Sequence, residues 1–264
     1  MKNLKVSALQ LDLIWHDAGA NRAHIEALVS ATQPQGSLIV LPEMFTTGFS
    51  MEPAGLAERT NGPTAIWMQQ MAKKQDASLL GSMIITEGEH FYNRALLVNE
   101  QGLQAQYDKR HSFSLAGEDK VFSSGTEKVI IEVEGWKICL QICYDLRFPA
   151  YSRNIADEDG NYEYDLLIYV ANWPATRVQH WESLLQARAI ENQSYVIGVN
   201  RVGEDGNGLY YSGSSMIVDP MGKLIAKASG GEAVLEAELS ADFLSEMRGK
   251  FPFWRDADRF TIES

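Results

Sequence analysis

The middle of the chain carries an apolar run that ends in a cysteine and a polar turn, Trp136-Lys137-Ile138-Cys139-Leu140-Gln141-Ile142-Cys143-Tyr144-Asp145-Leu146-Arg147-Phe148-Pro149. Up to Ile142 the segment is typical of a buried strand, and a helix is expected at about 147–156. Cys143 would then lie on a turn from strand to helix, where a nucleophile is exposed and neighbouring backbone N–H groups can hold an oxyanion. The N-terminus of a helix would also favour thiolate over thiol.

The two cysteines of the chain receive different interpretations. For Cys143 the alternative to a nucleophile is a buried structural thiol, because free cysteine is among the most buried residue types. Cys139 falls inside the strand and is assigned to the core. Two thiols are too few for a disulfide framework or a four-ligand zinc site, and their spacing is not that of a redox pair.

Two further chemical groups follow candidate strands elsewhere in the chain. Glu43 comes after the buried run 37–41, and Lys109 ends a strand candidate at 103–108. Open α/β sheets place their sites at the carboxyl ends of strands, although a loop acid and a surface lysine are the ordinary alternatives. Together with Cys143 these residues supply a base, a cation and a thiol, which is a recognisable catalytic combination.

Strands and helices alternate along the chain, with hairpins inserted between them. This order predicts a layered α/β fold with mixed rather than purely parallel sheets, built as one domain over residues 1–264. Asp17 is expected to cap the first helix. The expected helices are 18–32, 63–75, 147–156 and 180–193, and the expected strands are 5–11, 37–41, 78–85, 92–98, 103–108, 129–133, 136–142, 166–170, 195–199, 210–218 and 223–227.

The composition argues against several classes of protein. The formal charge is −12 and no basic run occurs, so nucleic acid and anionic membrane surfaces are poor partners. A hydrophobic content of 45% excludes a disordered chain. Gln10 and Asp12 interrupt the first apolar run, and no stretch approaches the ~18 apolar residues of a membrane span. We therefore expect a soluble, cytoplasmic protein.

Three segments resemble, in order and separation, the signature segments of the nitrilase superfamily: Leu41-Pro42-Glu43, Tyr107-Asp108-Lys109-Arg110-His111 and Cys143-Tyr144-Asp145-Leu146-Arg147-Phe148-Pro149. Later segments at 169–174 and 188–192 extend the resemblance over nearly the whole chain. It implies a four-layer αββα sandwich of two mixed sheets forming one carbon-nitrogen hydrolase domain. It also implies a homodimer, formed with a helical face, to which the apolar cluster 251–254 could contribute. Packing of that cluster on its own domain is the alternative.

The resemblance assigns a role to each catalytic candidate. It implies that Glu43 is the general base, that Lys109 stabilises the tetrahedral oxyanion, and that Cys143 is the nucleophile that forms a thioester. The backbone N–H of Tyr144 would be a second oxyanion donor. A family pattern that continues to Phe122 and Gly125 marks Glu118 as a second glutamate that positions substrate and lysine and could assist proton transfer. No metal or cofactor is required.

Two features of the loop after Lys109 bear on these assignments. The alternative for Glu118 is a solvated loop acid beside Asp119. The chain also departs from the commoner Lys-x-His-Leu form of the family, because Ser112 follows His111. This departure concerns the conformation of the loop and leaves the lysine assignment unaffected.

The segments 41–49, 171–174 and 200–203 resemble the bacterial omega-amidase branch, whose members are similar to 2-oxoglutaramate amidases. The resemblance implies hydrolysis of the terminal amide of 2-oxo acids, such as 2-oxoglutaramate and 2-oxosuccinamate, with release of ammonia. A substrate carboxylate needs a cationic partner, for which Arg177 is the candidate. An apolar wall is assigned to Phe45, Phe49 and Trp173, with ordinary packing as the alternative for each residue.

The family pattern is compatible with other functions. A carbamoylase or another small-amide hydrolase would use the same catalytic residues with a different pocket. A non-catalytic scaffold is disfavoured, because it has no need for all three catalytic groups, and a true nitrilase fits the cysteine segment less well. Arg147, Arg188 and Glu191 are interpreted as structural, with Arg188 paired to Glu191 one helical turn later.

Overall fold

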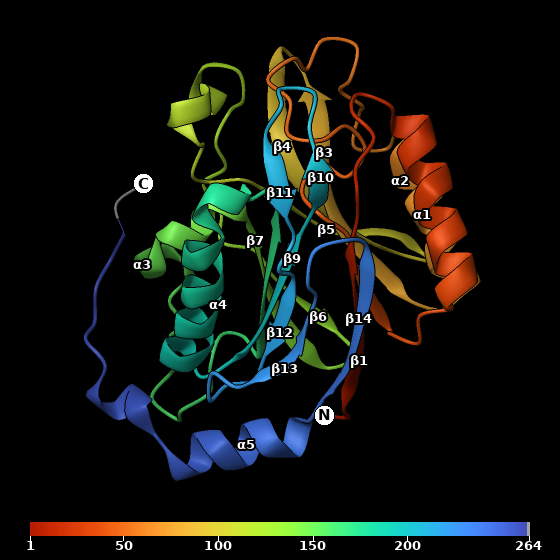
Figure 1. Cartoon of the computed structure of the whole chain (residues 1–264). Coiled ribbons are helices and arrows are strands. Elements are labelled where there is room, and N and C mark those ends of the chain that lie inside the picture. Colours follow the sequence, from red (N-terminus) through yellow and green to blue (C-terminus); the bar gives the residue numbers. More distant parts are fainter. Residues whose placement is uncertain (263–264) are drawn as a thin grey trace.

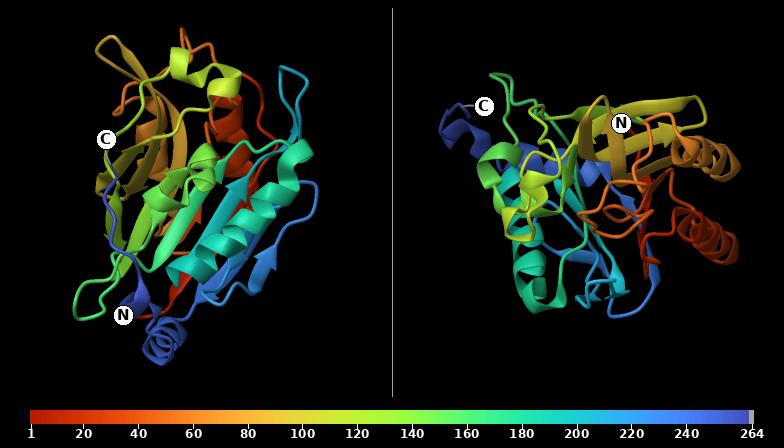
Figure 2. Two further views of the ribbon diagram at one scale, coloured as in Figure 1. Left: turned by 90° about the vertical axis from the view of Figure 1, so that its left-hand side faces the viewer. Right: turned by 90° about the horizontal axis from the view of Figure 1, so that it is seen from above.

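The computed structural model describes residues 1–262 and stacks four layers in the order helices, sheet, sheet, helices (Figures 1 and 2). One outer layer consists of α1 (Ala18–Thr32) and α2 (Pro63–Gln75). The other consists of the short α3 (Pro149–Ser152) and the longer α4 (Val178–Asn192). The expected αββα sandwich of two mixed sheets is therefore confirmed.

The first sheet has six strands with three parallel strands beside an antiparallel meander. The parallel strands are β1, β2 and β3, while β14 pairs antiparallel with β1 at one edge and β4 and β5 continue antiparallel at the other. Because β4 reverses the direction and β5 reverses it again, β5 ends at the same edge of the sheet as β2 and β3. In spatial order the strands are β14 (Ala233–Leu239), β1 (Leu4–Gln10), β2 (Leu38–Val40), β3 (Ser78–Glu87), β4 (His90–Asn99) and β5 (Gly102–Asp108).

The second sheet also has six strands around a parallel centre. Its parallel strands are β7, β8 and β9, flanked by antiparallel β6 on one side and antiparallel β12 and β13 on the other. A separate two-stranded ribbon pairs β10 (Val202–Glu204) with β11 (Tyr210–Ser212). In spatial order the large sheet contains β13 (Leu224–Lys227), β12 (Met216–Val218), β9 (Tyr195–Asn200), β8 (Leu166–Ala171), β7 (Trp136–Ile142) and β6 (Ile130–Val133).

Buried apolar layers hold the sandwich together. Side chains on one face of β1, β2 and β4 pack against β7, β8 and β9 between the sheets, while the opposite face of the first sheet packs against α1 and α2. This follows from the period of two in a strand, which sends successive side chains to opposite faces. Strands such as β8 are covered on both faces and are accordingly apolar throughout.

The helices are fixed by caps and close contacts. Asp17 accepts a hydrogen bond of 2.8 Å from the backbone N–H of Ala20, so the expected cap of α1 is confirmed. On the other side of the molecule α4 lies very close to β9, since a Cβ built on Gly198 would come within 2.3 Å of Leu185 Cδ1. Within residues 1–262, the structure has no helix with the length and apolar character that a membrane crossing requires.

The structure differs from the sequence-based expectation in several elements. The helix expected at about 147–156 is instead a 3-10 turn, Cys143–Arg147, followed by the four residues of α3, because Phe148 between them has non-helical torsion angles. The strand expected at 210–218 is interrupted by Gly213 and Ser214, both at positive φ. Strands β10 and β14 and helix α5 (Ala241–Lys250) were not expected. After α5 the chain runs along the outside of the α3–α4 layer (Figure 1).

Candidate active site

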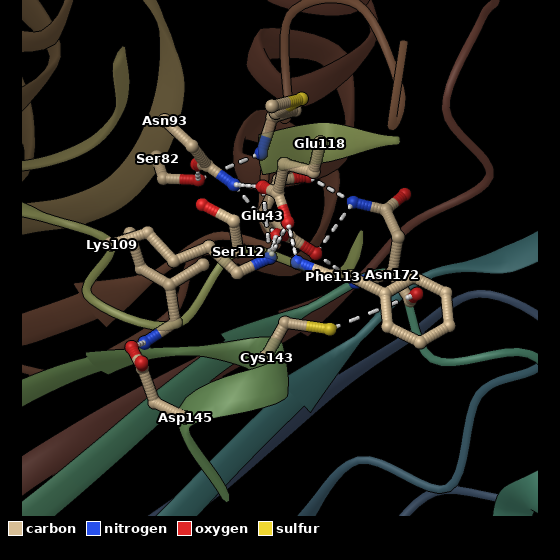
Figure 3. Close-up of polar contacts among 12 residues, drawn as sticks. Glu43, Ser82, Asn93, Lys109, Ser112, Phe113, Glu118, Cys143, Asp145 and Asn172 are labelled. Carbon is tan, nitrogen blue, oxygen red and sulfur yellow. Dashed lines mark hydrogen bonds and ion pairs between the residues drawn. The ribbon is translucent and has the colours of Figure 1, made fainter. Parts of the chain in front are cut away.

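The three residues predicted to carry the chemistry lie at the ends of strands from both sheets. Glu43 follows β2 and Lys109 follows β5 of the first sheet, whereas Cys143 and Asn172 follow β7 and β8 of the second. The strands place them at one end of the sandwich, where contacts join all four residues (Figure 3). The sequence therefore located each group, and the packing of the two sheets brings the groups together.

Lys109 lies between two carboxylates in the buried part of the site. Its Nζ donates to Glu43 Oε1 at 2.9 Å and to both oxygens of Glu118 at 3.0 and 2.9 Å. Glu43, Lys109 and Glu118 are respectively 0%, 3% and 1% exposed, so water does not screen these pairs. Burial opposes charge on Lys109, but Glu118 and Glu43 outweigh it and raise the lysine pKa above its ordinary value. The site therefore holds an ammonium group.

Glu118 belongs to this cluster and is not a solvated loop acid. Its carboxylate also accepts the backbone N–H of Phe113 at 2.5 Å, which ties down the loop after β5. Burial raises the pKa of Glu118, with Lys109 opposing that shift and Glu43 adding to it. One ammonium group cannot neutralise the charge of two carboxylates. The amide of Asn93 supplies a further hydrogen-bond donor to both of them.

Asn93 is a site residue that the sequence analysis missed. Its Nδ2 donates to Glu43 Oε1 at 2.7 Å and to Glu118 Oε1 at 3.3 Å. Ser82 Oγ donates to Asn93 Oδ1 at 2.9 Å and accepts the backbone N–H of Met44 at 2.9 Å. The available signal was a polar asparagine inside an expected strand, just before its apolar half, because a buried amide needs polar partners.

Asn172 holds Oε2 of Glu43, the carboxylate oxygen that Lys109 does not contact. Its backbone N–H donates to Glu43 Oε2 at 2.7 Å, and its Nδ2 donates to the Glu43 carbonyl at 2.6 Å. These contacts cross between the two sheets, so Glu43 is held by donors from both. Its carboxylate is aimed by at least three hydrogen bonds, which is the fixed geometry that proton transfer requires.

Cys143 sits on a sharp turn with φ of +45°, in the left-handed region that a non-glycine residue rarely adopts. Its Sγ lies 3.9 Å from the carbonyl oxygen of Asn172. Burial, followed by the charge of Glu43, raises the pKa of the thiol well above its usual value despite the opposing effect of Lys109. This corrects the expectation of a thiolate at a helix N-terminus: no α-helix begins at Cys143, and the buried thiol keeps its proton.

Asp145 connects the cysteine turn to the lysine segment. Its buried carboxylate accepts the backbone N–H of Ile142 at 2.9 Å and the hydroxyl of Tyr107 at 2.8 Å. It also accepts the backbone N–H and Nδ1 of His111 at 3.0 and 2.7 Å. Four donors from both lysine-side and cysteine-side segments thus converge on one carboxylate, which fixes the cysteine turn relative to Lys109. Sequence alone did not assign this role.

A small cavity of about 30 Å³ opens beside the thiol and is partly open to solvent. Four of the residues expected around the substrate line it, namely Tyr144, Phe49, Trp173 and Arg177. Its full lining is Phe49, Lys109, Phe113, Cys143, Tyr144, Arg147, Asn172, Trp173, Pro174 and Arg177.

Two assignments change once the cavity is known. Phe45 does not line it, because its side chain is 0% exposed in the core between the first sheet and α2, 6.0 Å from the ring of Trp67. Arg147, interpreted as structural, does line it. The expected pair of Arg188 with Glu191 is confirmed at 2.8 Å, and Cys139 is confirmed as a core residue.

Comparisons with known proteins agree with this geometry. A family model described as carbon-nitrogen hydrolase matches residues 5–248. The chain is 46% identical to the omega-amidase YafV of Yersinia enterocolitica over 99% of this chain and 100% of that protein. It is 31% identical to the 2-oxoglutaramate amidase of Bacillus subtilis, over 95% and 96% of the two chains. The crystal structure of XC1258 from Xanthomonas campestris, a CN-hydrolase superfamily protein with an arsenic adduct in its active site, is 40% identical and superimposes with a TM-score of 0.96 over 100% of both chains.

Proposed function

The chain belongs to the carbon-nitrogen hydrolase family of the nitrilase superfamily and is an amidase, and from this premise we propose that it hydrolyses the terminal amide of a small 2-oxo dicarboxylic acid monoamide. The candidate substrates are 2-oxoglutaramate and 2-oxosuccinamate, which would yield the dicarboxylic acid and ammonia. The observation that carries the proposal is the cavity itself, which joins Cys143 to the cationic side chain of Arg177. The names of the omega-amidase and 2-oxoglutaramate amidase relatives support the same substrate class.

In the proposed first step, Glu43 accepts the proton of the Cys143 thiol while Sγ forms a bond to the amide carbon. The carbonyl oxygen becomes negatively charged, and the ammonium of Lys109 with the backbone N–H of Tyr144 stabilises it. A thiol that keeps its proton at rest fits this order of events, since the base removes the proton only when the substrate is present.

In the second step the tetrahedral intermediate breaks its C–N bond. Glu43 returns the proton to the leaving nitrogen, ammonia departs, and the acyl group stays on Cys143 as a thioester. Glu43 then takes a proton from water, whose oxygen attacks the thioester carbon. The C–S bond breaks, the acid leaves, and the proton returns to the thiol. Glu118 keeps Lys109 in position through both steps, as its two contacts of 2.9 and 3.0 Å support.

Arg177 would bind the substrate carboxylate at the far end of the cavity, because a guanidinium offers several N–H donors in a fixed plane. Phe49 and Trp173 would line the carbon chain between the two ends. The proposal is tested by measuring ammonia release from 2-oxoglutaramate, 2-oxosuccinamate, glutamine, carbamoyl amino acids and simple nitriles. We expect the highest kcat/KM for the two 2-oxo monoamides, and a higher value for a carbamoyl amino acid would refute this assignment.

We also propose that the chain forms a homodimer through the α3–α4 face and the segment after α5. Phe253 and Phe260 in this segment are 61% and 45% exposed, and a cavity of about 520 Å³ lies between it and residues 153–162. Apolar surface of this kind is costly unless it is covered. Light scattering at micromolar concentration is expected to give twice the mass of the chain, and a monomeric mass would contradict the proposal.

A further inference from the structure

Two arginines on the wall of the active-site cavity have no acidic partner among residues 1–262. Arg147 and Arg177 both line the cavity, yet neither forms an ion pair with a carboxylate in the described part of the chain. They are the two arginines of the cavity lining. Several other arginines do pair with Asp or Glu, namely Arg22, Arg94, Arg188, Arg201 and Arg248.

Aromatic rings hold these two guanidinium groups in place of carboxylates. Arg147 stacks over the ring of Trp173, with 4.7 Å from Cζ to the ring centroid, and Arg177 lies 5.6 Å over the ring of Phe113. One nitrogen of Arg147 also lies 3.2 Å from Nδ1 of His180. Stacking fixes the plane of a guanidinium while most of its N–H donors stay available. The result is two oriented cations whose charge the protein leaves uncompensated.

Both cations belong to the same small space as the reactive thiol. Arg147 ends the 3-10 turn that begins with Cys143, so the turn that exposes the thiol also carries the guanidinium. Trp173, on which Arg147 stacks, follows Asn172, whose carbonyl oxygen is the contact of Cys143 Sγ. A substrate whose amide carbon reaches Sγ therefore extends along a wall that carries Arg147 and Arg177.

We propose that Arg147 and Arg177 together form a carboxylate subsite that selects amides with an uncompensated negative charge over amino-acid amides. The inference rests on the proposed function and names the residues that set its specificity. A carboxylate can accept charge-assisted hydrogen bonds from both guanidinium groups. In glutamine or asparagine an ammonium group stands next to the carboxylate, so binding would place it near two cations and like-charge repulsion would oppose it. A 2-oxo group at that position carries no positive charge and can accept a hydrogen bond.

Three stable amides with five carbons separate these effects. Glutaramate carries the carboxylate alone, L-glutamine adds the ammonium group, and pentanamide has neither. Ammonia release is measured with each amide for the wild type and for Arg147→Met, which keeps the apolar contact with Trp173 and removes the charge. Arg147→Lys restores the charge without the planar donor set, and Arg59→Met is a matched control at an exposed arginine remote from the cavity lining. Binding of the same amides to Cys143→Ala, with and without Arg147→Met, gives a readout that needs no turnover.

The wild type is expected to prefer glutaramate over glutamine and over pentanamide in both assays. Arg147→Met is expected to lower kcat/KM and affinity for glutaramate by roughly 10- to 100-fold, the usual range for a lost hydrogen bond to a charged group, and to shrink the preference over both other amides. Arg147→Lys should recover part of the loss, and Arg59→Met should match the wild type.

Two results would overturn the inference. The kcat/KM for glutaramate could stay unchanged in Arg147→Met, or all three amides could weaken by the same factor. Either result would mean that Arg147 only packs against Trp173. Failure of the proposed function gives a different result: the wild type would keep its preference for glutaramate in binding and would release no ammonia from 2-oxoglutaramate.

Discussion

Cys139 and Cys143 belong to the same segment, and their surroundings show what makes one of them suited to catalysis. Burial raises the pKa of both thiols, to about 12 for Cys139 and well above the usual value for Cys143. Cys139 lies within β7 and is 0% exposed in the core. Cys143 stands on a strained turn and opens onto the cavity that Lys109 also lines. A low pKa therefore does not distinguish the proposed nucleophile from Cys139. Cys143 differs from Cys139 in its access to the cavity and in having the base Glu43 nearby.

The largest expected difference between the two positions is in turnover. Cys143→Ala should abolish ammonia release, because no other thiol lies in the cavity lining. Cys139→Ala should keep most of the activity and lose about 1 kcal/mol of unfolding free energy, since it removes a small buried group from the core. Steady-state kinetics and chemical denaturation of both variants measure the two effects. A Cys139→Ala enzyme as inactive as Cys143→Ala would remove the distinction between the two thiols.

Replacing the base should be almost as damaging as removing the thiol. Glu43→Gln preserves the shape of the side chain but cannot accept the thiol proton. Groups that act as a unit lose nearly the whole rate enhancement when one of them is lost. The matched control is Glu52→Gln, an exposed acid in the following loop, which should leave kcat unchanged. If Glu43→Gln kept a tenth of the wild-type kcat, another group would have to be the base.

Replacing Asp145, which connects the cysteine turn to the lysine segment, should lower activity less than the two changes above. The loss should appear in kcat more than in KM. Asp145→Asn removes an acceptor from Ile142, Tyr107 and His111, so the turn with Cys143 can move relative to Lys109. Displacement of reacting groups by about 1 Å can cost roughly 100-fold in rate, and we expect a loss of about 10- to 100-fold. Tyr107→Phe removes only one donor and should lose less. Equal losses in kcat and in 1/KM would argue against a positioning role.

The smallest expected effect concerns pH. Because the pKa of Cys143 is raised, its thiol is protonated at neutral pH and becomes more reactive as pH rises through and beyond pH 9, the ordinary value for cysteine. The rate of alkylation by iodoacetamide in the absence of substrate should therefore still be climbing at pH 9. Intact-protein mass after timed quenching gives this rate, and Cys143→Ala corrects it for other sites. A plateau below pH 8 would show a resting thiolate paired with Lys109.

Strand ends were the part of the site that sequence could predict. The segments around Glu43, Lys109 and Cys143 each carry a local motif, and a motif needs no knowledge of the fold. Asn93 and Asp145 act through partners far away in the chain, such as Glu43 for Asn93 and Tyr107 for Asp145. Arg147 was interpreted as structural for the same reason, because the ring that orients it belongs to a different segment.

The fold shows the same limit at its C-terminal end. The residues of β14, Ala-Val-Leu-Glu-Ala-Glu-Leu, include several good helix formers, so local propensity does not indicate a strand there. They are extended because they pair with β1, with Leu239 opposite Leu4 and Ala233 opposite Gln10. The elements from β1 to β9 with clear apolar periodicity were largely located, although their ends shifted by a few residues and the helix after Cys143 shortened to α3.

The central claim is that Cys143, and not Cys139, bonds covalently to the carbonyl carbon of an amide substrate. Intact-protein mass spectrometry after rapid mixing of the wild type, Cys139→Ala and Cys143→Ala with 2-oxoglutaramate tests it directly, with glutaramate as a second substrate. An adduct equal to the amide minus ammonia should form on the wild type and on Cys139→Ala, decay as ammonia accumulates, and be missing from Cys143→Ala. An adduct of that mass on Cys143→Ala, or full turnover by that variant, would contradict the account.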